Sequence, residues 1–93
     1  LDQHGQRYMR PGPVTIIGRV RASDIIVDDS GVSRRHLEIR LTAGHTVATD
    51  LGSTNGTFVE GVRMDAATLV NGNTITIGHT TIMFWDGSDE VSG

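Results

Sequence analysis

The chain has 93 residues, of which 37% are hydrophobic and 20% are charged, and a chain of this length forms one small domain. It contains no cysteine, which excludes disulfide bonds, zinc–thiolate sites and a cysteine nucleophile. The formal net charge of −3 argues against general nucleic-acid binding, because neutralising a phosphate backbone requires a basic surface. Any attraction for an anion must therefore be local.

The sequence also gives expectations for the localisation and the boundaries of the domain. No apolar run approaches the roughly 18 residues that cross a bilayer, and the start of the chain has no signal-peptide pattern. We expect a cytoplasmic module that does not insert into a membrane, or the cytosolic part of a larger protein. Because the chain begins at Leu1 and ends in DGSDEVSG, we expect an excised domain with flexible flanks at 1–5 and 87–93 around a folded domain at 6–86.

Two-residue alternation of apolar and polar side chains dominates the chain and is typical of strands. Leu37 and Ile39, for example, alternate with Glu38 and Arg40. In chain order the predicted strands are 14–17, 25–27, 36–41, 46–50, 57–59, 74–77 and 80–85. Gly- and Asn-rich turns separate them, and 64–70 is expected to give at most a turn or two of helix. The pattern predicts an all-β sandwich.

Three polar loops adjoin the predicted strands: GRVRASD at 18–24, DDSGVSRRH at 28–36 and DLGSTNGT at 50–57. Loops at one end of a sandwich converge, so these three segments are expected to form a single rim. All eight basic residues of the chain are arginine, and half of them fall in this region: Arg19, Arg21, Arg34 and Arg35. The loops are therefore the place to look for a site.

The spacing of Gly18-Arg19, Ser33-Arg34-Arg35-His36 and Asn55-Gly56 resembles the forkhead-associated (FHA) domain family. The resemblance covers roughly residues 14–84. It implies an eleven-stranded, antiparallel-rich β-sandwich whose loops at one end bind phosphothreonine peptides. Such a module is neither an enzyme nor dependent on a metal or cofactor, and its partners are Ser/Thr kinases or their substrates. It would act as a phosphorylation-dependent adaptor within a larger signalling protein.

The resemblance also implies a role for each motif residue. Arg19 and Ser33 bind the phosphate, Arg34 and Thr54 contact the phosphate or the peptide, and Asn55 binds the peptide backbone beside the phosphothreonine. Gly18, His36 and Gly56 support the loops structurally.

The chemistry of these side chains suits a phosphate, which brings about −1.5 to −2 charges and three acceptor oxygens. Arginine offers a planar pair of donors that is always charged, and serine adds a short hydroxyl donor. If the extended geometry of the strand at Leu37 continues into the loop, Arg34 and Arg35 point to opposite sides. We therefore expect Arg34 to face the ligand and Arg35 to face solvent or a carboxylate such as Asp28 or Asp29.

Catalytic and metal-binding interpretations fit the same residues less well. Ser33 and His36 lack the orienting acid and oxyanion hole of a hydrolase, and a chain without lysine cannot form a P-loop. The remaining histidines, His4, His45 and His79, show no metal-ligand spacing, so His36 is expected to make a structural hydrogen bond. Asp24, Asp28 and Asp29 are expected to form a solvated face or to pair with arginines.

Two functional alternatives remain open. The sandwich could be an interaction module that binds proteins independently of phosphate, or it could bind a phosphothreonine within its own parent chain. Specificity for the residues that flank the phosphothreonine would come from variable loop positions. The candidates for this role, which one sequence cannot rank, are Val32, Ser53 and Arg21.

Overall fold

The computed structural model describes residues 6–9 and 13–85, so the flanks expected at 1–5 and 87–93 lie outside the described residues. The described residues contain strands and no helix, and none of them can therefore form a membrane-spanning helix. The ten strands are β1 (Gln6–Met9), β2 (Val14–Gly18), β3 (Ile25–Ile26), β4 (Leu37–Thr42), β5 (His45–Asp50), β6 (Thr57–Val59), β7 (Val62–Met64), β8 (Ala66–Leu69), β9 (Thr74–Ile77) and β10 (Thr80–Phe84).

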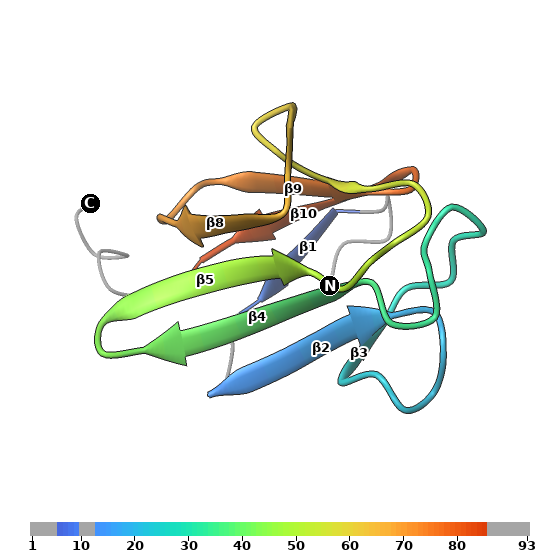
Figure 1. Ribbon diagram of the computed structural model, residues 1–93, viewed down its shortest axis with the longest axis horizontal. Helices are drawn as coiled ribbons and strands as arrows, with labels where there is room; N and C mark the ends of the chain where they lie inside the picture. The colour runs from blue at the N-terminus through green and yellow to red at the C-terminus, as the bar shows by residue number, and fades with distance from the viewer. Residues whose placement is uncertain (1–5, 10–12, 86–93) are drawn as a thin grey trace.

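The strands form two five-stranded sheets that face each other (Figure 1). One sheet has the order β1-β10-β9-β6-β7 and the other has the order β3-β2-β4-β5-β8. All pairs are antiparallel except β1 with β10 and β2 with β3. The prediction of an antiparallel-rich all-β sandwich is confirmed, with ten strands in the described residues where eleven were expected.

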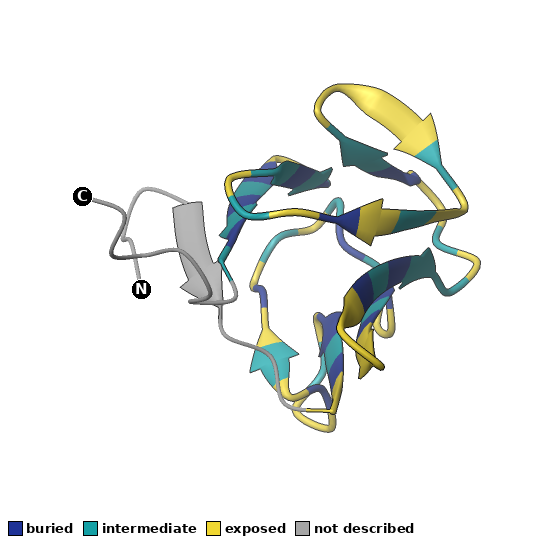
Figure 2. Ribbon diagram, turned by 90° about the vertical axis from the view of Figure 1, so that its left-hand side faces the viewer, coloured by how far each residue is buried: buried dark blue, intermediate teal, exposed yellow. Residues whose placement is uncertain are grey.

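The core lies between the two sheets and follows the alternation seen in the sequence. Leu37 and Ile39 of β4 and Ile75 and Ile77 of β9 are fully buried from opposite sheets, and Phe84 of β10 joins them. Figure 2 shows the resulting change between buried and exposed residues along the strands. Each apolar side chain turned inward is removed from water, which is the main contribution that holds the sheets together.

All seven predicted strands are present, and three further strands, β1, β7 and β8, were not predicted. Residues 64–70, which were expected to give at most a turn or two of helix, form none. Residues 66–69 instead pair with β5 as an edge strand, with Leu69 opposite Thr46 and its side chain in the core. Pairing with an existing strand thus decided the conformation of a segment whose own pattern is ambiguous.

The long connections gather at one end of the sandwich, on the right in Figure 1. They are the first loop, residues 19–24 between β2 and β3; the second loop, residues 27–36 between β3 and β4; and the third loop, residues 51–56 between β5 and β6. The sheets therefore act as a rigid support that brings the three polar segments of the sequence together.

The two apolar side chains Ile39 and Leu41 of β4 give a matched test of the core. Ile39 is fully buried, whereas Leu41 is 45% exposed. We expect Ile39→Ala to lower the free energy of unfolding by about 3 kcal/mol and Leu41→Ala to lower it by less than about 1 kcal/mol. Denaturant titration of both variants measures the difference, and equal losses would contradict this description of the core.

Candidate ligand-binding site

Arg19 leaves the end of β2 and is joined to the second loop by both its backbone and its side chain. Its backbone N–H donates to the carbonyl oxygens of Arg34, at 3.0 Å, and Ser33, at 3.2 Å. Its side-chain Nε donates to the carbonyl oxygen of Val32 at 2.8 Å. The two terminal guanidinium nitrogens have no partner among the described residues and the side chain is exposed. One edge of the guanidinium is therefore fixed while the other two nitrogens remain able to donate.

Gly18, directly before Arg19, permits this close approach. A Cβ atom at this buried position would overlap the carbonyl oxygen of Arg34 and would lie 2.8 Å from Ser23 Oγ. The same carbonyl accepts the Arg19 N–H and, at 3.3 Å, the Ser23 hydroxyl. A side chain at residue 18 would push the first and second loops apart.

Ser33 and Asn55 connect the second loop to the third loop. The Ser33 hydroxyl oxygen accepts a bond from the Thr54 N–H at 3.1 Å, which leaves the hydroxyl hydrogen able to donate to another group. The Asn55 side-chain Nδ2 donates to the Gly31 carbonyl at 3.0 Å, and the amide oxygen remains without a partner among the described residues. Thr54 and Asn55 are both exposed at this junction.

His36 is fully buried beneath the junction and connects the same two loops. Its Nδ1 accepts a bond from the Ser33 N–H at 3.0 Å, so the ring proton lies on Nε2, which donates to the Gly56 carbonyl at 2.8 Å. Gly56 itself has a φ of 90°, a conformation that favours glycine. Both ring nitrogens of His36 are thus used by backbone groups of the loops.

Asp50, at the end of β5, organises the third loop. Its carboxylate accepts bonds from the N–H groups of Gly52 and Ser53 and from the hydroxyl groups of Ser53 and Thr57. Burial raises the pKa of Asp50, but the hydroxyl and N–H donors outweigh burial and hold the pKa below its ordinary value. The Ser53 hydroxyl oxygen in turn accepts the Gly56 N–H at 2.9 Å, which closes the turn that carries Thr54 and Asn55.

Arg34 and Arg35 are both exposed, and neither side chain has a partner among the described residues. Of the two alternatives expected for Arg35, the structure shows exposure to solvent: no ion pair joins Arg35 to Asp28 or Asp29 among the described residues, and the Asp29 carboxylate accepts bonds from other donors. Residues 34 and 35 form a bend and not an extended strand, so alternation with Leu37 does not fix their directions. Which of the two faces a ligand therefore stays a prediction.

Several other expectations need correction. Val32 is 1% exposed and belongs to the core, and the Ser53 hydroxyl is bonded to Asp50. Of the three flanking-residue candidates, only Arg21 is exposed and has a side chain without a partner among the described residues. Asp24 is exposed, as expected of a solvated face, and its carboxylate also accepts the Ile16 N–H at 2.7 Å. Within the residues that the structure describes, no group of three or more His, Cys, Asp or Glu side chains could hold a metal ion.

Comparison with known proteins identifies this arrangement of loops. The family model described as FHA domain matches residues 15–78, which is well over half of the chain. The chain belongs to the FHA domain family.

Three relatives illustrate the match. The glycogen accumulation regulator GarA of Mycolicibacterium smegmatis is 43% identical over 83 residues, which cover 89% of this chain and 52% of GarA. An FHA domain solved in an analysis of phosphothreonine-dependent FHA domain interactions is 40% identical with a TM-score of 0.75, covering 78% of this chain and 76% of that chain. The FhaA FHA domain, solved with the intracellular domain of Rv3910, is 39% identical with a TM-score of 0.74, covering 80% and 81%. The chain thus spans about half the length of GarA.

The sequence analysis did not assign the roles of two carboxylates of this FHA domain. Asp50 shapes the third loop, and Asp29 joins the second loop to the turn between β9 and β10. The sequence carries a signal for both roles, since each Asp is followed two or three residues later by Gly or Ser. This pattern is typical of turns in which the carboxylate accepts backbone N–H groups. The partners Thr57 and Thr80 could not be read from local spacing.

The close contact between Gly18 and the Arg34 carbonyl predicts that a methyl group added at residue 18 destabilises the FHA domain. We expect Gly18→Ala to lower the free energy of unfolding by about 3 kcal/mol, because the Arg34 backbone must move. Gly44→Ala is the control: its φ of 84° is strained for alanine, but nothing lies within 4 Å of the added carbon, so a loss of about 1 kcal/mol is expected. Denaturant titration compares the two, and a milder effect at Gly18 than at Gly44 would refute the steric explanation.

Proposed function

We propose that the chain is a phosphopeptide-binding module that recognises phosphothreonine in substrates of Ser/Thr kinases. The observation that carries this proposal is the state of Arg19 and Ser33. The second loop holds Arg19 through its Nε, and the third loop holds Ser33 through its hydroxyl oxygen. Both side chains keep further donors available at the same end of the sandwich. Three donors, two of them on a charged planar group, suit the oxygens of a phosphate monoester.

The neighbouring residues support recognition of a peptide as well as of a phosphate. Asn55 keeps an amide oxygen and one N–H for the backbone of a ligand, so it can grip an extended peptide without demanding a particular side chain. Thr54 and Arg34 lie beside Ser33 in the two loops and present exposed polar groups to the phosphate or the peptide. Gly18, His36 and Gly56 would act through the loop geometry described above.

The proposal favours a binding module over an enzyme and a phosphate-dependent over a phosphate-independent interaction. One of the similar solved FHA domains comes from a study of phosphothreonine-dependent interactions, and another was solved with an intracellular domain of a second protein. These relatives support a role as a phosphorylation-dependent adaptor in the cytoplasm, within a larger signalling protein. Its partner would be a phosphothreonine-containing protein, either a Ser/Thr kinase or a kinase substrate.

The proposal is tested with a phosphothreonine peptide library and its unphosphorylated twin, titrated by calorimetry or fluorescence anisotropy. For the best phosphopeptides we expect a Kd in the micromolar range, which corresponds to a binding free energy on the order of −8 kcal/mol. The unphosphorylated peptides should show no measurable binding. Arg19→Ala should weaken binding by roughly 10- to 100-fold, because a charged hydrogen-bond donor pair is lost. Arg40→Ala is the control, since Arg40 pairs with Glu38 on β4 away from the loops. Equal binding of both peptide sets would sink the proposal.

The two exposed arginines of the second loop allow a second test. Because Arg34 follows Ser33 directly and matches the family position that contacts phosphate or peptide, we expect Arg34→Ala to weaken phosphopeptide binding by roughly 5- to 10-fold. Arg35→Ala should change the Kd by less than about twofold, since an exposed charge that makes no contact contributes little. The same titration measures both variants. A larger loss in Arg35→Ala would reverse the assignment of the two side chains.

A further inference from the structure

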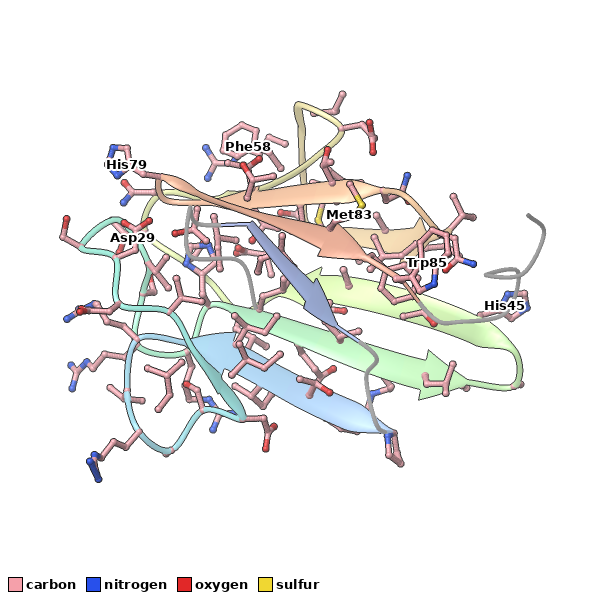
Figure 3. All side chains as sticks on the ribbon, turned by 180° about the vertical axis from the view of Figure 1, so that it is seen from behind. Asp29, His45, Phe58, His79, Met83 and Trp85 are labelled. Atoms are coloured by element: carbon pink, nitrogen blue, oxygen red, sulfur yellow. The ribbon has the colours of Figure 1, made fainter. Side chains whose placement is uncertain are left out.

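The Asp29 carboxylate joins the second loop to the turn between β9 and β10. Its Oδ2 accepts the His79 N–H at 2.8 Å and the Thr80 hydroxyl at 2.7 Å, and its Oδ1 accepts the Gly31 N–H at 2.8 Å. The Asp29 side chain is only 8% exposed, although the neighbouring His79 side chain is 87% exposed. Figure 3 shows the two residues next to each other at the end of the sandwich opposite Trp85.

The hydrogen bonds to the Asp29 carboxylate favour its ionised form. The Thr80 hydroxyl is the largest cause that lowers the pKa of Asp29 to about 2; burial opposes it, and the N–H groups of Gly31 and His79 add to it. Asp29 is therefore ionised at neutral pH, and each of its donors gains from the full negative charge.

The second loop and the turn also touch backbone to backbone. A Cβ atom on Gly31 would lie 2.8 Å from the Cα of Gly78, and a Cβ atom on Gly78 would lie 2.8 Å from the carbonyl carbon of Gly31. No side chain fits between these two glycines. Within the loop, the Val32 N–H donates to the Asp29 carbonyl at 2.9 Å, so residues 29–32 form a tight turn seated directly on the β9–β10 turn.

This tight turn supplies the two carbonyl groups that hold the proposed ligand-binding side chains. The Gly31 carbonyl accepts Asn55 Nδ2 at 3.0 Å, and the Val32 carbonyl accepts Arg19 Nε at 2.8 Å. We infer that Asp29 is a positioning residue: by fixing residues 29–32 against the β9–β10 turn, it sets the directions of these two carbonyls and, through them, of Asn55 and Arg19. The inference rests on the proposed phosphopeptide function and deepens it.

Asp29 is expected to act without touching the ligand, because its carboxylate oxygens are used by donors of the domain itself. In Asp29→Asn the side chain keeps its shape and can still accept the Gly31 N–H, but the amide NH₂ group faces the His79 N–H, which is also a donor. The segment is then free to move away from the β9–β10 turn. We expect the Kd for a phosphothreonine peptide to rise about 5- to 10-fold while the protein stays folded at 25 °C.

Glu60→Gln provides the matched control for a purely structural effect. Glu60 is a carboxylate in the turn between β6 and β7, where it accepts the Thr74 N–H at 2.7 Å and Asn73 Nδ2 at 3.3 Å. It belongs to the same sheet as the Asp29 partners, but Thr74 lies at the end of β9 away from Ile77 and Thr80. Its substitution removes a carboxylate that accepts a backbone N–H and a side-chain donor, as Asp29→Asn does, and should change the phosphopeptide Kd by less than twofold.

Double-mutant cycles separate positioning from general destabilisation. If Asp29 acts through Asn55 and Arg19, then Asn55→Ala or Arg19→Ala must cost less in the Asp29→Asn background than in the wild type. Thr80→Val, which removes one donor to the same carboxylate and keeps the side-chain volume, should raise the Kd about twofold and serves if Asp29→Asn does not fold. Titration of one phosphothreonine peptide and its unphosphorylated twin against each variant provides all of these values.

The outcomes distinguish the inference from the proposed function. Wild-type protein that binds both peptides equally overturns the proposed function, and the inference with it. The inference alone is overturned if the wild-type protein prefers the phosphopeptide but the Asp29→Asn or Thr80→Val variant binds it as tightly as the wild type does. The inference is also overturned if the loss of affinity in Asp29→Asn is fully additive with the losses in Asn55→Ala and Arg19→Ala. The same holds if Glu60→Gln raises the Kd as much as Asp29→Asn does.

Discussion

The geometry of the site depends on one requirement, that the carbonyl groups in the middle of the second loop find hydrogen-bond donors although no strand pairs with residues 31–34. The carbonyls of Gly31 and Val32 are satisfied by side-chain nitrogens of Asn55 and Arg19, and that of Arg34 by the Arg19 backbone and Ser23. The residues proposed to bind the ligand are thus also those that complete the loop. Loss of one of them changes both the donors offered to a ligand and the shape of the rim.

The acidic residues of the domain explain how a chain with a net charge of −3 can offer a positive site. Asp24, Asp29 and Asp50 turn their carboxylates toward backbone N–H and hydroxyl groups of the loops and of the adjoining strands, and not toward the arginines. Among the residues that the structure describes, none of the arginines in the first and second loops forms an ion pair. The negative charges therefore order the loops from within while the guanidinium groups stay available at the surface.

Much of the fold, and the three loops that form the candidate site, could be predicted, because both depend on short-range patterns. Alternation around Leu37 and Ile39 reveals a strand, and the motif spacing reveals which loops matter. The remainder depends on contacts between distant residues: Asp29 meets Thr80 51 positions later, and β8 is a strand because β5 offers it an edge. The directions of the Arg34 and Arg35 side chains could not be predicted from strand alternation, because the backbone bends at these residues.

The bond from Arg19 Nε to the Val32 carbonyl has a consequence for the entropy of binding. An arginine side chain has about 2 kcal/mol of rotamer entropy to lose when it is immobilised, and here folding has already removed part of that freedom. A lysine at residue 19 would keep the positive charge but has no nitrogen partway along its side chain, so nothing would hold it before a ligand arrived. The advantage of arginine at this position therefore belongs to the free domain as much as to the complex.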